Sequence, residues 1–170
     1  ELLAAGAVRL AGRPVHKPAT PVAAQDDIDV ADPEHRWVGR AARKLHDALA
    51  AWEPEGLRVA GRRCVDVGAS TGGFTQVLLA AGAATVEAVD VGHGQLAPEL
   101  ACDPRVTDRS GTTVRGLTAA DLGGAADLVV ADLSFISLTL VLPELAGRLG
   151  PGGDLVVLVK PQFEVGRARL

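Results

Sequence analysis

The chain has 170 residues, of which 48% are hydrophobic and 22% charged, and its 17 basic and 21 acidic side chains give a formal net charge of −4. A chain of this length can form one hydrophobic core, which predicts one domain with an appendage and excludes a second full domain. The acidic balance argues against a protein that coats nucleic acid without specificity, although a local basic face is compatible with it.

The first 22 residues predict a small unit that is too short to be a stable domain. The pattern indicates a helix end closed by Gly6, a strand over residues 7–10, a tight turn and a second strand around Val15. Residues 23–36 are polar and acidic and contain a proline, which predicts a linker.

A helix is predicted to follow the linker. Apolar residues recur near a helical period from Trp37 to Trp52, and Pro54 and Gly56 end the pattern. The periodic positions between the two tryptophans are Val38, Ala41, Ala42, Leu45 and Leu49.

Beyond residue 57 the chain alternates between predicted strands and helices. The strands are expected at residues 64–67, 85–91, 105–108, 127–133 and 154–160, and the helices at residues 74–82, 95–102 and 137–149. Continuous apolar strands separated by helices are typical of a parallel sheet covered on both faces. We therefore expect an α/β fold with a doubly wound parallel sheet.

Two further features narrow the class of protein. No apolar run approaches the roughly 18 residues that span a bilayer, and no charged and apolar leader is visible, so we expect a soluble, cytoplasmic protein. Cys64 lies in an apolar segment and Cys102 at the end of a helical one, which predicts two thiols rather than a disulfide or a metal pair. No metal is expected.

Polar residues stand at the carboxyl ends of four predicted strands. They are Asp66, Asp90, Asp132 and Lys160. Ligands of open α/β sheets bind outside these ends of the strands. One polar residue at such a place often does no more than end a strand, but four together indicate a binding site.

The loop GASTGG, residues 68–73, follows the first of these strands and allows three interpretations. Its first five residues fit the G-x-S-x-G pattern around a hydrolase nucleophile at Ser70, but the only later histidine, His93, precedes Asp132 and breaks the usual order of the triad. A nicotinamide dinucleotide site would use Asp90 for a ribose, but Ser70 replaces the second glycine of the G-x-G-x-x-G fingerprint.

S-adenosylmethionine, the third interpretation, fits this segment better. It carries a carboxylate, an ammonium and a sulfonium beside a ribose and an adenine. Backbone N–H groups of the loop and of the helix that follows can receive the carboxylate, Asp66 can face the cationic groups, and Asp90 can accept both ribose hydroxyls. The predicted cofactor-binding residues are Asp66, Gly68, Ala69, Ser70, Gly72, Gly73, Phe74, Asp90, Val91 and Asp132.

Lysine is rare in this chain, and two of its three lysines extend the site. Lys44, Asp132 and Lys160 form a candidate catalytic set, because methylating a ribose hydroxyl needs a nearby base and a positioned attack. Taken alone, Lys44 is more simply explained as a solvated residue on a surface helix, and Lys160 equally well as a strand end.

Four segments resemble the TlyA hemolysin-type ribosomal RNA methyltransferases, which carry an FtsJ-like ribose 2′-O-methyltransferase domain. They are DVGASTGGF, AVDVGHGQL, DLVVADLSFISL and LVKPQFEVGR, beginning at residues 66, 88, 127 and 158. The motifs are highly specific together, and the similarity covers nearly the whole chain. The resemblance implies a Rossmann-like S-adenosylmethionine-dependent methyltransferase fold, here lacking its last strands, that acts on ribosomal RNA or ribosomal subunits.

The resemblance also implies a domain organisation. Residues 1–22 look like the second half of a small alpha-L RNA-binding domain, and residues 23–36 then form the linker. Residues 37–170 look like the FtsJ-like methyltransferase domain, incomplete at its C-terminal end.

Roles for single residues carry over in the same way. The family's catalytic lysine, aspartate and second lysine match Lys44, Asp132 and Lys160, with Lys160 as the expected base, whereas the family's glutamate has no counterpart within the chain. Phosphate contacts are expected from Lys17, Arg40 and Arg43.

Two other functions remain open. The family name records hemolysis, but the most apolar predicted helix, residues 137–149, is better explained by packing on a sheet. An inactive RNA-binding relative that keeps the fold would carry the same motifs.

Overall fold

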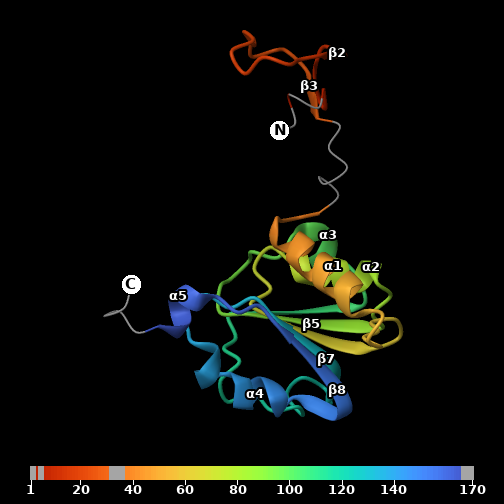
Figure 1. Ribbon diagram of the computed structural model, residues 1–170, viewed down its shortest axis with the longest axis vertical. Helices are drawn as coiled ribbons and strands as arrows, with labels where there is room; N and C mark the ends of the chain where they lie inside the picture. Colours follow the sequence, from red (N-terminus) through yellow and green to blue (C-terminus); the bar gives the residue numbers. More distant parts are fainter. Residues whose placement is uncertain (1–2, 4–5, 31–36, 166–170) are drawn as a thin grey trace. The chain divides into compact units, whose positions relative to one another are not determined.

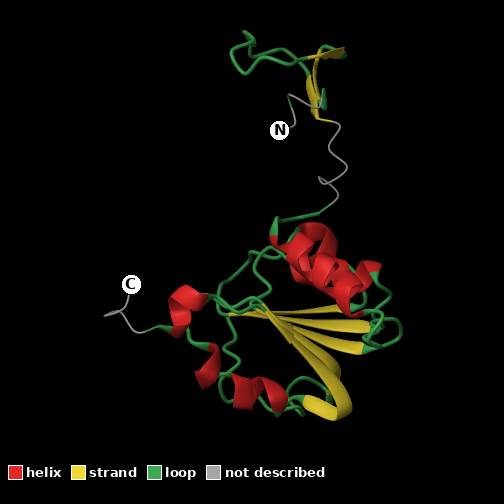
Figure 2. Ribbon diagram, in the orientation of Figure 1, coloured by secondary structure: helices red, strands yellow, loops and turns green. Residues whose placement is uncertain are grey.

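The computed structural model of the protein describes residues 3, 6–30 and 37–165, and the chain divides into two compact units. The smaller unit spans Glu1–Trp37 and the larger unit Val38–Leu170. Figure 1 follows the chain through both units, and Figure 2 shows their helices and strands. The larger unit contains the parallel sheet.

The smaller unit contains a three-stranded antiparallel sheet in the order β2-β1-β3. A two-residue turn joins β1 (Val8–Leu10) to β2 (Arg13–Pro14), and its residues Ala11 and Gly12 have φ angles of 46° and 77°. Two positive φ angles are typical of the tight hairpin turn that matches the twist of paired strands. The predicted turn is confirmed, whereas the helix end predicted before Gly6 falls mostly outside the described residues.

The third strand, β3 (Ile28–Val30), lies within the segment that the sequence predicted to be a linker. It pairs with β1 along its whole length, and the N–H of Ala11 donates to the carbonyl oxygen of Asp27 at 2.9 Å. The linker prediction is therefore wrong for residues 28–30. The strand is short, and Ile28 and Asp29 are both exposed, so no alternation of apolar and polar residues marks it.

The larger unit contains a five-stranded parallel sheet in the order β6-β5-β4-β7-β8. Its strands are β4 (Arg63–Val67), β5 (Thr85–Asp90), β6 (Val106–Ser110), β7 (Ala126–Ala131) and β8 (Leu149–Val157). The strand order reverses between β4 and β7, which places the expected ligand crevice at their carboxyl ends. The predicted doubly wound α/β sheet is confirmed.

Helices cover both faces of this sheet (Figure 1). On one face lie α1 (Ala41–Trp52), α2 (Gly73–Ala80) and α3 (Pro98–Ala101), and on the other lies α4 (Leu142–Ala146). A short helix, α5 (Pro161–Glu164), follows β8. The central strands are therefore buried on both faces, which explains why their sequences are continuously apolar.

The core under α4 holds the central strands together. Its buried members are Val65, Val67, Val89, Val114, Leu122, Ala126, Val129, Ala131, Leu138, Val141 and Leu145. Because protein interiors are close-packed, this cluster fixes the carboxyl ends of β4, β5 and β7 relative to one another.

The segment predicted to be one helix over residues 137–149 is divided. A 3-10 helix, η2 (Leu138–Leu140), comes first, and α4 then begins with Pro143 in its first turn, where the missing N–H breaks no helical hydrogen bond. Strand β8 starts at Leu149, earlier than the predicted strand at residues 154–160, includes Gly150, Gly152 and Gly153, and has a register shift opposite β7. It ends at Val157, so Lys160 follows the strand instead of lying in it.

Both cysteines are free thiols, as predicted, with Cys64 buried and Cys102 exposed. Within the described part of the chain, no helix is long and apolar enough to cross a bilayer. The same residues include no group of three or more His, Cys, Asp or Glu side chains that could hold a metal ion.

Candidate functional site

The loop between β4 and α2 depends on left-handed backbone conformations. Gly68 and Gly72 have φ angles of 84° and 97°, and Ser70 adopts 49°, which is uncommon for a residue with a side chain. A Cβ atom at position 68 would lie 2.7 Å from the carbonyl oxygen of Asp132. Glycine at this position therefore lets the loop approach the residues that follow β7.

Asp90 ends β5 and holds the loop in place. One of its carboxylate oxygens accepts a hydrogen bond from the N–H of Ser70 at 2.8 Å, and the other accepts one from the N–H of Gly92 at 2.7 Å. Each carboxylate oxygen has a second lone pair, so Asp90 retains acceptor capacity for sugar hydroxyls. The Ser70 hydroxyl donates to Gln95 Oε1 at 3.3 Å, so it is not paired with a histidine as a nucleophile elbow requires.

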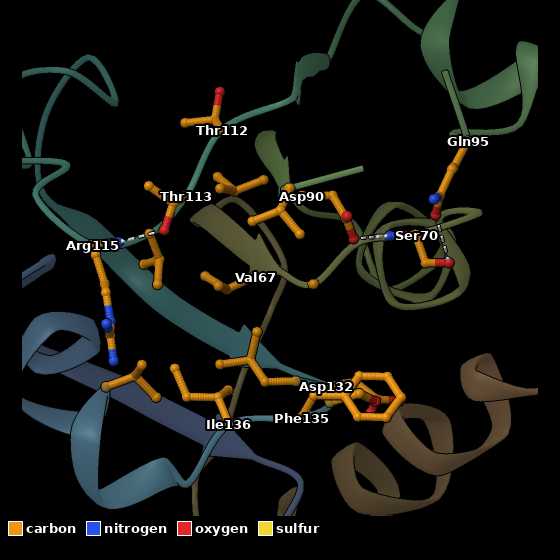
Figure 3. Close-up of a pocket in the computed structure, with 17 residues that line it drawn as sticks. Val67, Ser70, Asp90, Gln95, Thr112, Thr113, Arg115, Asp132, Phe135 and Ile136 are labelled. Carbon is orange, nitrogen blue, oxygen red and sulfur yellow. Dashed lines mark hydrogen bonds between the residues drawn. The ribbon is translucent and has the colours of Figure 1, made fainter. Parts of the chain in front are cut away.

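A first hollow of about 480 Å³ lies at the carboxyl ends of β4, β5 and β7. Figure 3 shows Asp90 and Ser70 on one side of it, Thr113 and Arg115 on the opposite side, and Asp132 along a third edge. Aliphatic side chains line the space between them: Val67, Val89, Val91, Val114, Leu133, Ile136 and Val141. An apolar space with a carboxylate at one side suits a nucleoside, whose base can pack on the aliphatic groups while its ribose reaches Asp90.

A second hollow of about 540 Å³ adjoins the first and is more polar. It is lined by Gly39, Arg40, Ala41, Lys44, Gly68, Ala69, Ser70, Thr71, Gly73, Phe74, Asp132, Ser134 and Lys160. Four of these residues also line the first hollow, namely Gly68, Ser70, Asp132 and Ser134. Groups bound in the two hollows would therefore meet at this shared wall, which we call the junction.

Two lysines meet the carboxylate of Asp132 at the junction. Lys160 Nζ lies 2.6 Å from Oδ1, and Lys44 Nζ lies 3.3 Å from Oδ2. The side chain of Asp132 is 12% exposed, that of Lys160 18% and that of Lys44 48%. The predicted catalytic set is thus brought together from three distant parts of the sequence, with Lys160 the more enclosed of the two amines.

Lys160 is held by a second contact and by the helix that it precedes. Its Nζ donates to Ser134 Oγ at 2.7 Å. In α5, the carboxylate of Glu164 accepts hydrogen bonds from the N–H of Leu138 at 2.9 Å and from Ser137 Oγ at 2.6 Å, and these bonds lower the pKa of Glu164. Helix α5 is therefore fastened to η2, which fixes the backbone at Lys160.

Asp66 lies beneath the loop and lines neither hollow, although the sequence predicted that it faces the cofactor. Its side chain is fully buried, and Oδ2 accepts a hydrogen bond from Thr75 Oγ1 at 2.7 Å. Burial raises the pKa of Asp66 to about 7 against the opposing hydrogen bonds from Thr75. Strand alternation gives the reason, because it turns Asp66 away from the face of Val65 and Val67 and toward α2.

The other predicted cofactor residues line one hollow or the other, with one exception. Ala69, Gly73 and Phe74 line the second hollow, and Val91 lines the first. Gly72 lines neither of them. A Cβ atom there would meet side chains of and before α3, so its role is to let α3 pack against the loop.

The three predicted phosphate contacts are separated. Arg40 precedes α1 and lines the second hollow, whereas Arg43 is exposed on α1 and lines neither hollow. Lys17 belongs to the smaller unit, where it lines a separate cavity of about 110 Å³.

Several lining residues were missed at the level of sequence. Ser134 lies at the junction, Gln95 bonds the loop, and Arg115 follows β6 in a segment without a helix. Phe135 has a φ angle of 64° and is 91% exposed, and its ring packs on Phe163 with the centroids 5.3 Å apart. A serine, glutamine or aromatic residue in a loop follows no periodic pattern, so only its place in three dimensions connects it with the site.

The chain matches the FtsJ-like methyltransferase family over residues 37–170. The "16S/23S rRNA (cytidine-2′-O)-methyltransferase TlyA" of Mycobacterium tuberculosis (strain CDC 1551 / Oshkosh) is 56% identical over 171 residues. That alignment covers 100% of this chain and 63% of the relative, so the chain spans less than two thirds of the relative's length.

Solved structures give the same fold. A Streptococcus thermophilus protein named as a hemolysin superposes with a TM-score of 0.78 at 40% identity, covering 99% of this chain and 61% of that one. A SAM-dependent methyltransferase from Thiobacillus denitrificans, solved with S-adenosyl-L-homocysteine, superposes with a TM-score of 0.51 at 18% identity over 74% of this chain and 48% of that one. At so low an identity the second likeness shows the fold alone, which is the Rossmann-like methyltransferase fold that the sequence predicted.

Proposed function

The chain belongs to the FtsJ-like methyltransferase family, and we propose that its protein transfers a methyl group from S-adenosylmethionine to a ribose 2′-hydroxyl of ribosomal RNA. The observation that carries this proposal is the carboxylate of Asp132, which meets Lys44 and Lys160 at the junction of the two hollows. A cofactor in the first hollow and a ribose in the second would come together there. The name of the Mycobacterium tuberculosis relative describes the same reaction on cytidine, which supports the proposal.

S-adenosylmethionine fits the residues of the first hollow. Asp90 would accept hydrogen bonds from its ribose, the aliphatic walls would pack on its adenine, and the loop before α2 would offer N–H groups to its carboxylate. When bound, it supplies a methyl group on a positively charged sulfur, which leaves as a neutral thioether. Asp132 places a carboxylate at the junction, where this positive charge would be stabilised.

RNA fits the charge of the second hollow. Arg40, Lys44 and Lys160 line it, and cationic side chains of this kind bind phosphate oxygens. In this proposal Arg43 on α1 and Lys17 in the smaller unit extend the phosphate contacts, and residues 1–22 are part of a small RNA-binding domain. The methyltransferase domain then begins at residue 37, and the protein works where ribosomal subunits are present, in the cytoplasm.

Lys160 is the proposed general base. Its amine, in the neutral form, takes the proton of the 2′-hydroxyl so that the oxygen can form its bond to the methyl carbon. Asp132 stabilises the ammonium that results, because their atoms lie 2.6 Å apart. Lys44, on the other carboxylate oxygen, keeps Asp132 oriented.

Labelled S-adenosylmethionine and unmodified ribosomal subunits test this function with the full-length protein that carries the chain. After methyl transfer, the RNA is hydrolysed with alkali, which needs a free 2′-hydroxyl next to each bond that it cleaves. Label in an alkali-resistant dinucleotide is the expected result. Label in mononucleotides would place the methyl group on a base and remove the role of Lys160, and absence of label would contradict the proposed reaction.

A further inference from the structure

Ser134 lies at the junction and contacts Lys160, but it has no role in the reaction proposed above. It follows Asp132 by two residues, lines both hollows, and its Oγ accepts a hydrogen bond from Lys160 Nζ at 2.7 Å. The same Nζ lies 2.6 Å from Asp132 Oδ1. Lys160 Nζ thus has one hydrogen-bond acceptor, Ser134 Oγ, and one close carboxylate oxygen, Asp132 Oδ1, both supplied by the short segment after β7.

The bonding of the amine determines how these two oxygens affect its lone pair. A neutral primary amine has two N–H bonds and one lone pair, and only the lone pair can remove a proton. Ser134 Oγ takes one N–H bond of the amine, and the negative charge of Asp132 close to Nζ disfavours the lone pair on that side, so the lone pair is left to face the remaining direction. Lys160 also lines the second hollow, which is where the proposed ribose binds.

We infer that Ser134 is a positioning residue that fixes the direction of the Lys160 lone pair; this inference rests on the proposed methyl transfer. With Asp132 as its only partner, the amine would rotate about its Cε–Nζ bond, and the lone pair would face the ribose for a smaller share of the time. Correct orientation of a catalytic group speeds a reaction, so loss of the Ser134 hydroxyl should lower kcat. No contact of Ser134 with the ribose itself is needed.

Other charged groups around Lys160 come from two elements. Asp132 follows β7, while Arg40 and Lys44 are contributed by α1 and the residue before it, and all three line the second hollow. An oxygen acceptor interacts more strongly with an ammonium than with a neutral amine. Removing the Ser134 hydroxyl should therefore shift the acid limb of the pH–rate profile to lower pH, in addition to lowering the plateau.

The test compares Ser134→Ala and Ser134→Thr in the full-length protein by single-turnover methyl transfer to ribosomal subunits. One hydrogen bond is worth about a twofold to tenfold change, so S134A should lower the rate at saturation by about that factor, and S134T should restore it because it keeps a hydroxyl. The dissociation constant of S-adenosylhomocysteine, measured by calorimetry, should stay within about twofold of wild type. Ser110→Ala is the matched control, because its hydroxyl bonds Asp108 at 2.6 Å and lines neither hollow.

Three results would overturn the inference. They are an S134A rate equal to that of wild type at every pH, a loss of rate that S134T fails to restore, and a loss confined to cofactor affinity. A wild-type protein that transfers no methyl group would overturn the proposed function and this inference with it. An active wild type with an unaffected S134A variant would overturn the inference alone.

Discussion

At the scale of single residues, the site depends on carboxylates in contrasting environments. Asp132 is paired with two lysines, Asp90 is satisfied by backbone N–H groups, and Asp66 is buried with one oxygen, Oδ1, that has no partner among the described residues. Asp90 and Asp132 can serve a ligand because they line the hollows. Asp66 instead affects the stability of the fold.

Asp66→Asn should change how stability depends on pH. The folded state holds the Asp66 proton up to about pH 7, whereas the unfolded chain releases it near pH 3.8, so the carboxyl group makes the free energy of unfolding fall as pH rises between these values. The slope from this one group is at most about 1.4 kcal/mol per pH unit. The asparagine variant lacks this slope, so its free energy of unfolding should increase relative to that of wild type as the pH rises from 5 to 8.

Urea unfolding at several pH values measures the effect. Asp108→Asn, at an exposed position, serves as the control and should run parallel to wild type. Parallel curves for Asp66→Asn would show that Asp66 titrates in the folded protein as it does in the unfolded chain.

Sequence reasoning located Asp90, Asp132 and Lys160 because parallel strands bring their carboxyl ends to one edge of the sheet. It did not indicate that Asp66 is buried and lines neither hollow, since the side that a strand residue faces depends on which helix covers it. It missed Ser134, because no pattern marks a loop serine that meets a lysine 26 residues later. Lys44 was a candidate only because lysine is rare in the chain, and taken alone it was better explained as a surface residue; it reaches Asp132 across 88 residues.

At the scale of elements, the close approach of the β4–α2 loop to the end of β7 forms the junction. Strands β4 and β7 pair from Cys64↔Leu128 to Val67↔Ala131, and Gly68 follows at the point of contact. The loop and Asp132 therefore lie in close contact, so a change at Gly68 alters both the wall of the first hollow and the position of Asp132.

Gly68→Ala should disturb both stability and cofactor binding. The new Cβ atom would lie 2.7 Å from the carbonyl oxygen of Asp132 at a φ angle of 84°, so the loop or the end of β7 must shift. We expect a loss of about 1–3 kcal/mol in the free energy of unfolding and at least a tenfold weaker affinity for S-adenosylhomocysteine, by analogy with other strained positions. Thermal unfolding and calorimetry measure the two effects.

Gly116→Ala separates the backbone effect from the steric effect. Gly116 has a φ angle of 78°, but a Cβ atom there meets nothing within 4 Å. This variant should lose a little stability and keep its affinity for S-adenosylhomocysteine. Equal effects of the two substitutions on affinity would contradict the importance of the contact between Gly68 and Asp132.

The elements that the sequence predicted best are those buried on both faces. The runs that became β4, β5 and β7 are continuously apolar because neighbours and helices cover them. The short, exposed strand β3 has no such pattern, and Pro143 divides a segment whose apolar residues alone favour one helix. Local exposure and a single proline thus account for the two main differences.

At the scale of the whole molecule, an overall negative charge coexists with a cationic second hollow. The formal net charge is −4, yet three cationic residues, Arg40, Lys44 and Lys160, line the second hollow with one carboxylate, Asp132. Binding to RNA should therefore come from this local surface and weaken as salt rises.

Arg40→Ala should lower the salt dependence of RNA binding. Each phosphate contact that is lost reduces the slope of log Kobs against log salt by about 1, and binding should weaken for every RNA sequence tested. Fluorescence anisotropy over a salt series gives the slope. Arg58→Ala is the control, because Arg58 bonds backbone carbonyls near the far end of α1 and should leave the slope unchanged. An unchanged slope for Arg40→Ala would remove its phosphate role.

Lys160 is the proposed base, and Asp132 lies where the proposed cofactor and ribose hollows meet. The most direct measurement is single-turnover methyl transfer by a Lys160→Ala variant of the full-length protein, made together with its affinity for S-adenosylhomocysteine. We predict a loss of rate of about 10²–10⁴-fold, the contribution of a general base, with an affinity close to that of wild type. Lys44→Ala, which alters the more exposed lysine, should lose less. Equal loss of rate and of cofactor affinity in Lys160→Ala, or a rate near that of wild type, would contradict the claim.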